Sequence, residues 1–81
     1  MDEFPEELPE TGTTLGPIYY HGTDYTFQGV SDGHWLIEGP VGIRTEISRE
    51  DDGSLSLVRT DGKTSQSGAG DDWSELAAMY F

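Results

Sequence analysis

The stretch VGIRTEISRE at residues 41–50, followed by DDGSLSLVRT at residues 51–60, decides the fold. In its first half, every second position carries an apolar or β-branched side chain: Val41, Ile43, Thr45 and Ile47. This period of two is that of a β-strand with one buried face and one solvated face. The pair Asp52-Gly53 supplies the positive φ that a tight hairpin turn requires. We therefore expect strands over residues 41–49 and 54–60, joined as a hairpin.

Upstream of this hairpin, short runs rich in aromatic and β-branched residues predict strands over residues 17–21, 25–30 and 34–38. Asp32-Gly33, Gly39-Pro40 and Asp61-Gly62 mark further turns. Connections this short leave no room for the crossovers of a parallel sheet. The predicted fold is therefore mainly β, a small antiparallel meander of about five strands, either open or curled into a partial barrel.

Three other segments have distinct compositions. Residues 72–81 predict a short helix, because Asp72 and Glu75 resemble a capping box and apolar residues follow at helical spacing. Residues 62–70, GKTSQSGAG, have the composition of a flexible linker. Residues 1–16 predict a flexible acidic arm preceding a single domain over residues 17–81, with a linear motif built on Phe4 and Leu8 as the alternative.

The core is expected to be thin and aromatic. Only 33% of the 81 residues are apolar, yet they include two tryptophans, four tyrosines and three phenylalanines. A chain of this size buries only about 60% of its unfolded surface, so large rings must supply much of the burial. Cysteine is absent, the N-terminal residues are acidic, and no apolar run reaches the length of a membrane span. These features predict a cytoplasmic protein without disulfides.

Charge is the strongest compositional signal. Sixteen acidic residues against four lysines and arginines give a formal net charge of −12. Binding to phosphates requires clustered basic side chains, so direct binding to nucleic acid or to an anionic membrane is not expected. The complementary partner is a protein with a basic surface, such as a nucleic-acid-binding enzyme.

No motif indicates catalysis or a cofactor. Gly62-Lys63-Thr64 has the ending of a phosphate-binding loop, but Leu57 stands where that loop needs its first glycine. His21 and His34 have no spacing that defines a metal site. The acidic run at residues 50–53 lacks the ligand pattern of a calcium loop. We therefore expect a protein that is not an enzyme, with no catalytic residue, metal ligand or cofactor.

The candidate partner-binding residues are acidic. Three of them form the hairpin tip, and the others belong to adjacent strands and turns, where pairing in one sheet would bring them together. They are Glu38, Glu46, Glu50, Asp51, Asp52 and Asp61.

In size and charge the chain resembles small acidic inhibitors, among them phage anti-CRISPR and anti-restriction proteins; the likeness is one of composition. It implies a DNA mimic, a protein that occupies the basic nucleic-acid channel of its target, in the host cytoplasm if viral. One alternative is a small β-domain acting as an adaptor or subunit, whose acidity is an adaptation to a salt-rich cytoplasm. Another is a binding surface built from aromatic residues: Tyr19, Tyr20, Tyr25 and Trp35.

Overall fold

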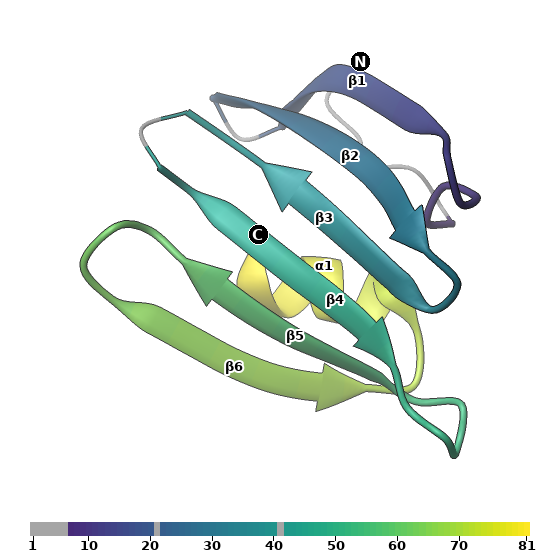
Figure 1. The fold of residues 1–81 in the computed structure, drawn as a ribbon. Helices are drawn as coiled ribbons and strands as arrows, with labels where there is room; N and C mark the ends of the chain where they lie inside the picture. Colours follow the sequence, from purple (N-terminus) through teal and green to yellow (C-terminus); the bar gives the residue numbers. More distant parts are fainter. Residues whose placement is uncertain (1–6, 21, 41) are drawn as a thin grey trace.

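The computed structural model describes residues 7–20, 22–40 and 42–81, and in them six antiparallel strands form one sheet followed by a short helix (Figure 1). The strands lie in chain order, with β1 and β6 at the two edges. The predicted antiparallel meander is thereby confirmed, and the sheet is open, not closed into a barrel. The elements are β1 (Thr14–Tyr20), β2 (Thr23–Ser31), β3 (His34–Glu38), β4 (Arg44–Arg49), β5 (Leu55–Thr60), β6 (Ser65–Gly70) and α1 (Trp73–Tyr80).

The Asp-Gly turns form where the sequence places them. Gly33, Gly53 and Gly62 have φ values of 76°, 89° and 93°, which only glycine adopts without strain. The strand expected over residues 41–49 is shorter, because the turn after β3 extends to Ile43, whose N–H donates to the Pro40 carbonyl at 3.2 Å. Val41 lies outside the described residues. The strand β4 therefore begins at Arg44.

The linker predicted over residues 62–70 is wrong, because most of it is strand β6. Ser65 pairs with Thr60 and Gly70 pairs with Leu55, so β6 runs antiparallel along the whole of β5. Its glycines have a packing role: a Cβ at Gly68 would collide with the ring of Tyr80, and one at Gly70 would lie 3.3 Å from Leu76 Cδ2. Small residues here allow α1 to lie directly on the sheet.

The predicted arm over residues 1–16 also differs from the structure. Strand β1 begins at Thr14, inside that segment. Pro9 is buried, and its carbonyl accepts a hydrogen bond from the Trp35 indole N–H at 2.7 Å. Leu8 packs against the core, so it is not available as the docking residue of a linear motif. Phe4 and the rest of residues 1–6 lie outside the described residues.

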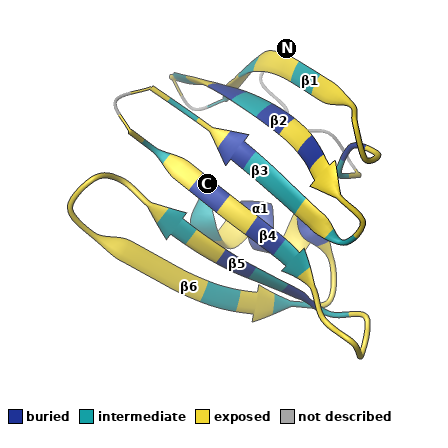
Figure 2. Cartoon of the chain, viewed as in Figure 1, coloured by how far each residue is buried: buried dark blue, intermediate teal, exposed yellow. Residues whose placement is uncertain are grey.

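The core lies between the sheet and α1. Along the strands buried and exposed residues alternate, so that one face is covered by the helix and the other is open to solvent (Figure 2). The rings of Phe27 and Trp73 meet edge to face with centroids 5.7 Å apart, which joins strand β2 to the helix. The buried apolar residues are Tyr25, Phe27, Ile37, Ile47, Leu55, Leu57, Trp73, Leu76 and Ala77.

The helix begins as predicted. Asp72 is its N-cap, and its carboxylate accepts a hydrogen bond from the Glu75 backbone N–H at 2.8 Å. Trp73, Leu76 and Ala77 lie on its buried face. With eight residues α1 falls well short of a membrane-spanning length, and the described part of the chain has no other helix.

Candidate partner-binding surface

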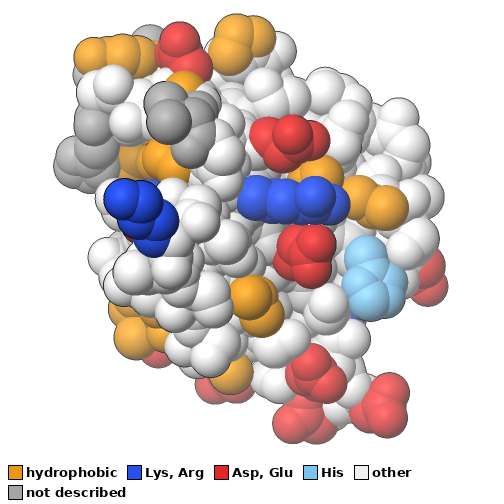
Figure 3. Space-filling view, turned by 60° about the vertical axis from the view of Figure 1, so that its left-hand side comes forward, with side chains coloured by type: hydrophobic (Ala, Val, Ile, Leu, Met, Phe, Trp, Pro, Cys, Tyr) orange, Lys and Arg blue, Asp and Glu red, His pale blue; other side chains and the backbone are white. Residues whose placement is uncertain are grey.

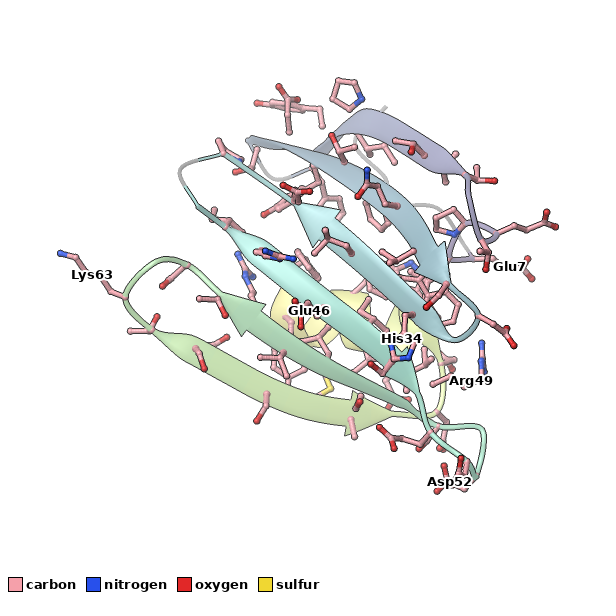
Figure 4. The ribbon with its side chains drawn as sticks, viewed as in Figure 1. Glu7, His34, Glu46, Arg49, Asp52 and Lys63 are labelled. Carbon is pink, nitrogen blue, oxygen red and sulfur yellow. The ribbon has the colours of Figure 1, made fainter. Side chains whose placement is uncertain are left out.

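Acidic turns gather at one end of the sheet. In an antiparallel meander every second connection lies at the same end, and here these are the β2–β3 turn, the β4–β5 turn and the β6–α1 connection. The Arg49 N–H donates to the Gly33 carbonyl at 2.8 Å, which ties the first two together. In Figure 4, Glu7 and Asp52 lie towards this end and Lys63 at the other. We call this region the acidic end: Glu7, Asp32, Glu50, Asp51, Asp52, Asp71 and Asp72.

The six predicted residues do not all meet there. Glu50, Asp51 and Asp52 belong to the acidic end, but Asp61 follows β5 and lies at the opposite end of the sheet. Six residues of extended strand separate the two turns, a span of about 20 Å. Glu38 lies at the same end as Asp61, because Glu38 is in register with Arg44, Arg44 is in register with Thr60, and Asp61 follows Thr60. The single negative surface drawn from the sequence is therefore divided.

Glu38 and Glu46 lie on the uncovered face beside a cation. The Arg44 guanidinium lies 3.6 Å from a carboxylate oxygen of Glu46, and Glu38 is the register partner of Arg44 across β3 and β4. Figure 3 shows acidic side chains on both sides of a basic one on the face that it presents. Their charge is thus partly neutralised locally, and these two residues contribute less to a negative surface than the sequence predicts.

Several acidic side chains also shape the turns that carry them. The Asp52 carboxylate accepts hydrogen bonds from the Ser54 N–H at 3.0 Å and the Ser54 hydroxyl at 2.6 Å, and the hydroxyl bond is the main cause that lowers the pKa of Asp52. The hydroxyl and N–H of Thr64 likewise lower the pKa of Asp61. Glu50 accepts from the Ser56 hydroxyl at 2.7 Å. Asp52 and Asp61 are therefore ionised at neutral pH, and hydrogen bonds hold the carboxylates of Glu50, Asp52 and Asp61 in fixed directions.

Other carboxylates at the acidic end have no hydrogen-bond or ion-pair partner among the described residues. Over residues 7–20, 22–40 and 42–81, the side chains of Glu7, Asp32, Asp51 and Asp71 make no hydrogen bond or ion pair. The sequence reasoning missed Glu7, Asp32, Asp71 and Asp72 as site residues. The signal that could have found Asp32 and Asp71 is the alternation of turns, since they occur two connections before and two connections after the one that contains Asp51.

A cleft of about 490 Å³ opens beside this end. Its floor is apolar and aromatic, and its rim is mostly acidic. The Arg49 guanidinium lies over the Trp35 ring at 5.5 Å and donates to the Gly53 carbonyl at 3.2 Å, so a cation already stacks at the cleft edge. Another long basic side chain would find apolar contacts for its stem and carboxylates for its charge. The lining residues are Glu7, Leu8, Trp35, Arg49, Leu55, Asp71, Asp72 and Trp73.

A second depression, of about 380 Å³, lies on the uncovered face. It mixes apolar residues, Val30 and Leu36, with the Arg44–Glu46 pair and with His34, whose Nδ1 lies 3.2 Å from the Ser48 hydroxyl. These groups do not converge on one point with a single chemical character. Across the described residues, no group of three or more histidines, cysteines and acids is placed to hold a metal ion.

Comparison with known proteins identifies no relative. Neither a family model, nor a curated protein, nor a solved structure matches the chain. The function must therefore be argued from the geometry of the acidic end and its cleft.

Proposed function

We propose that the protein is a non-catalytic inhibitor that binds, through its acidic end, the basic nucleic-acid-binding surface of another protein. The observation that supports this proposal is the uneven distribution of charge. Three acidic connections lie at one end with Arg49, whereas Asp24, Glu38 and Asp61 towards the other end are accompanied by Arg44 and Lys63. A negative surface of this kind attracts and orients a basic partner before contact.

The spacing of the acidic turns suits a surface that normally binds DNA. Strands in a sheet lie about 4.8 Å apart, so turns that recur every second strand are about 10 Å apart, and each carries one or more carboxylates. DNA carries one negative charge about every 3.4 Å along each strand, so the turns repeat negative charge in the same manner at a wider spacing. A basic channel would therefore meet repeated negative groups, held rigidly by the hydrogen bonds of Asp52 and Asp72.

The cleft adds a specific contact to this general attraction. Its aromatic floor, which includes Trp35 and Trp73, is bordered by Asp71 and Glu7. Arginine side chains stack on aromatic rings and bind carboxylates in a bidentate manner. The partner residue that we propose for the cleft is an arginine of the nucleic-acid-binding surface.

The aromatic alternative has less support in the packing. Tyr25 is buried in the core, and Trp35 is partly buried beneath Arg49 and bonded to Pro9. Tyr19 is 51% exposed, and its neighbour Tyr20 packs against the core. One exposed tyrosine on an edge strand does not make a hot spot of the usual kind, which is a cluster of buried anchors.

The test is a pair of charge-reversal variants with equal change in net charge. Glu50→Lys, Asp51→Lys and Asp52→Lys together alter the acidic end, and Asp24→Lys, Glu38→Lys and Asp61→Lys together alter the opposite end. The probes are an arginine-rich DNA-binding peptide and purified restriction and CRISPR nucleases, with displacement of labelled duplex DNA as the readout. Circular dichroism checks that each variant is folded.

We expect the acidic-end variant to lose at least about tenfold in affinity for the probe that binds, because several desolvated charge pairs are reversed. The variant at the opposite end should lose much less. Equal losses would mean that overall charge, and not this surface, causes binding. Failure of every probe to bind would contradict the proposed class of partner.

A further inference from the structure

Strand β6 is an open edge without the usual protection against pairing. It pairs with β5 on one side at every residue from Ser65 to Gly70, with no register shift, and no strand of the described residues lies on its other side. Its sequence, SQSGAG, contains no charge and no proline. Natural edge strands usually carry a charge, a proline or a bulge that blocks further pairing. The opposite edge, β1, has such protection, because Pro17 lacks an N–H and the register shifts between Leu15 and Ile18.

The backbone groups that face outward from β6 follow from the turn before it. The Asp61 N–H donates to the Thr64 carbonyl at 3.1 Å, and hydrogen-bonded pairs then recur at every second residue of an antiparallel ladder. Gln66, Gly68 and Gly70 thus bond to β5, and the N–H and C=O groups of Ser65, Ser67 and Ala69 point to the open edge. The Tyr80 hydroxyl donates to the Ser67 carbonyl at 3.2 Å, which leaves that oxygen a second lone pair.

We propose that a second copy of this chain pairs with β6 to form a symmetric dimer with one continuous sheet. A two-fold axis perpendicular to the sheet brings two β6 strands together antiparallel, so that each copy uses the same surface. With Ser67 on the axis, Ser65 lies opposite the partner's Ala69. All the outward N–H and C=O groups then find partners, and except for Gln66 the side chains of the two strands at the joint are small.

Charge complementarity fixes this register. Two residues before Ser65 stands Lys63, and in the same register it lies opposite the partner's Asp71. Both residues are exposed, and neither forms an ion pair with another residue in the described part of the chain. Figure 4 shows Lys63 extending away from the molecule, beyond the strand ends. The symmetry creates this pair twice, and each pair links the basic turn of one copy with the acidic end of the other.

The antiparallel arrangement also limits repulsion between two chains that each carry a net charge of −12. Because the two β6 strands run in opposite directions, the acidic end of one copy and the acidic end of the other lie at opposite ends of the strands in the joined sheet. Asp71, at the rim of the cleft, is paired in the dimer, whereas Glu7 and the hairpin tips at residues 50–53 stay accessible. The dimer does not depend on the proposed function, and it leaves most of the acidic end free.

The test is sedimentation equilibrium of the full chain over a range of concentrations at physiological salt. We expect a reversible monomer–dimer equilibrium. Ser67→Pro removes an outward N–H and should raise the dimer dissociation constant at least about tenfold, since the centre of the ladder is lost. A chain that stays monomeric up to about 1 mM, as it would if the edge binds a different protein, overturns the proposal.

Charge variants provide a test that does not depend on a proline in a strand. Lys63→Asp or Asp71→Lys alone should weaken the dimer a few-fold, because each places like charges opposite one another. The two together should restore it, because the pairs are re-formed with reversed polarity. Arg44→Asp, with the same change in charge away from β6, is the control. A double variant no stronger than the single ones overturns this register.

Discussion

Thr45 is the one polar residue in the core of the described chain. Its side chain is 0% exposed, and its hydroxyl oxygen has no hydrogen-bond partner among the described residues. It lies near the start of β4 on the covered side of the sheet, directly opposite the buried Ile37 of β3 and two residues before the buried Ile47. A buried hydroxyl without a partner costs free energy that a methyl group of similar shape does not.

Thr45→Val should therefore stabilise the protein by about 1–2 kcal/mol. Urea unfolding monitored by circular dichroism would measure this as a higher midpoint with an unchanged slope. Thr60→Val on neighbouring β5 is the matched control, because Thr60 is exposed. It should change stability by less than about 0.5 kcal/mol. A loss of stability in Thr45→Val would show that the hydroxyl has a partner, such as a buried water.

The sequence predicted the correct face of the strand for Thr45, but it did not predict that the Thr45 hydroxyl lacks a hydrogen-bond partner among the described residues. The period of two in residues 43–47 assigned it to the buried side, together with Ile43 and Ile47. Whether its hydroxyl finds an acceptor depends on the side chains that pack against that side of the sheet, which come from segments distant in sequence and are mostly apolar. Periodicity reports which side of a strand is buried, and it contains no information on what covers that side.

At the scale of elements, the helix depends on its cap. The Asp72 carboxylate accepts from the backbone N–H of Glu75 and from the Ser74 hydroxyl, and the backbone hydrogen bond is the main cause that lowers the pKa of Asp72. Helices as short as α1 are marginal without such a cap. The cap also fixes the direction in which the chain passes from β6, through the acidic end, into α1.

Asp72→Ala should lower the melting temperature at neutral pH, whereas Asp72→Asn, which keeps an acceptor, should do so much less. Because the folded-state pKa lies below the unfolded-state value of about 3.9, the stabilisation is complete above that value and is lost as pH falls through the folded-state pKa. The loss of stability in acid should therefore be smaller in Asp72→Asn. Thermal melts between about pH 2 and 7 measure this. Identical acid profiles for Asp72→Asn and the native chain would contradict the role of the charge.

The two elements at the C-terminal side were not equally predictable. The helix followed from local signals, a cap and an apolar face, which act within a few residues. Strand β6 did not, because Gly68 and Gly70 are small to accommodate Tyr80 and Leu76 of the helix above them. A strand made of such small polar residues has the same composition as a flexible linker, and only its contact with the helix distinguishes the strand from a linker.

At the scale of the whole molecule, the positions of the acidic residues along the chain were predictable, but their grouping in space was not. Each acidic turn was visible in the sequence, but grouping them required the order of strands in the sheet. Once the meander is known, connections that alternate between two ends divide the acids into the acidic end and a more balanced opposite end. Asp61 was assigned to the wrong group for this reason, since it is close to Asp52 in sequence but is separated from it by the length of β5.

The acidity has a second possible origin, because a salt-rich cytoplasm would also favour a net charge of −12. An adaptation of that kind makes folding depend on molar salt. A protein whose acids serve a partner should fold cooperatively at about 0.1 M salt, where charges more than about 10 Å apart are already screened. We therefore expect a cooperative melt by far-ultraviolet circular dichroism at about 0.1 M salt and a modest rise in melting temperature at about 3 M.

The variant with Glu50, Asp51 and Asp52 changed to lysine makes this experiment more specific. If repulsion at the acidic end is the main cost of that surface, the variant should show a smaller rise in melting temperature between the two salt concentrations than the native chain. The variant altered at Asp24, Glu38 and Asp61 should keep most of the native rise, because Arg44 already offsets charge there. A native chain that is unfolded at low salt and folded only near 3 M would assign the acidity to the environment, and the proposed inhibitor would lose its principal support.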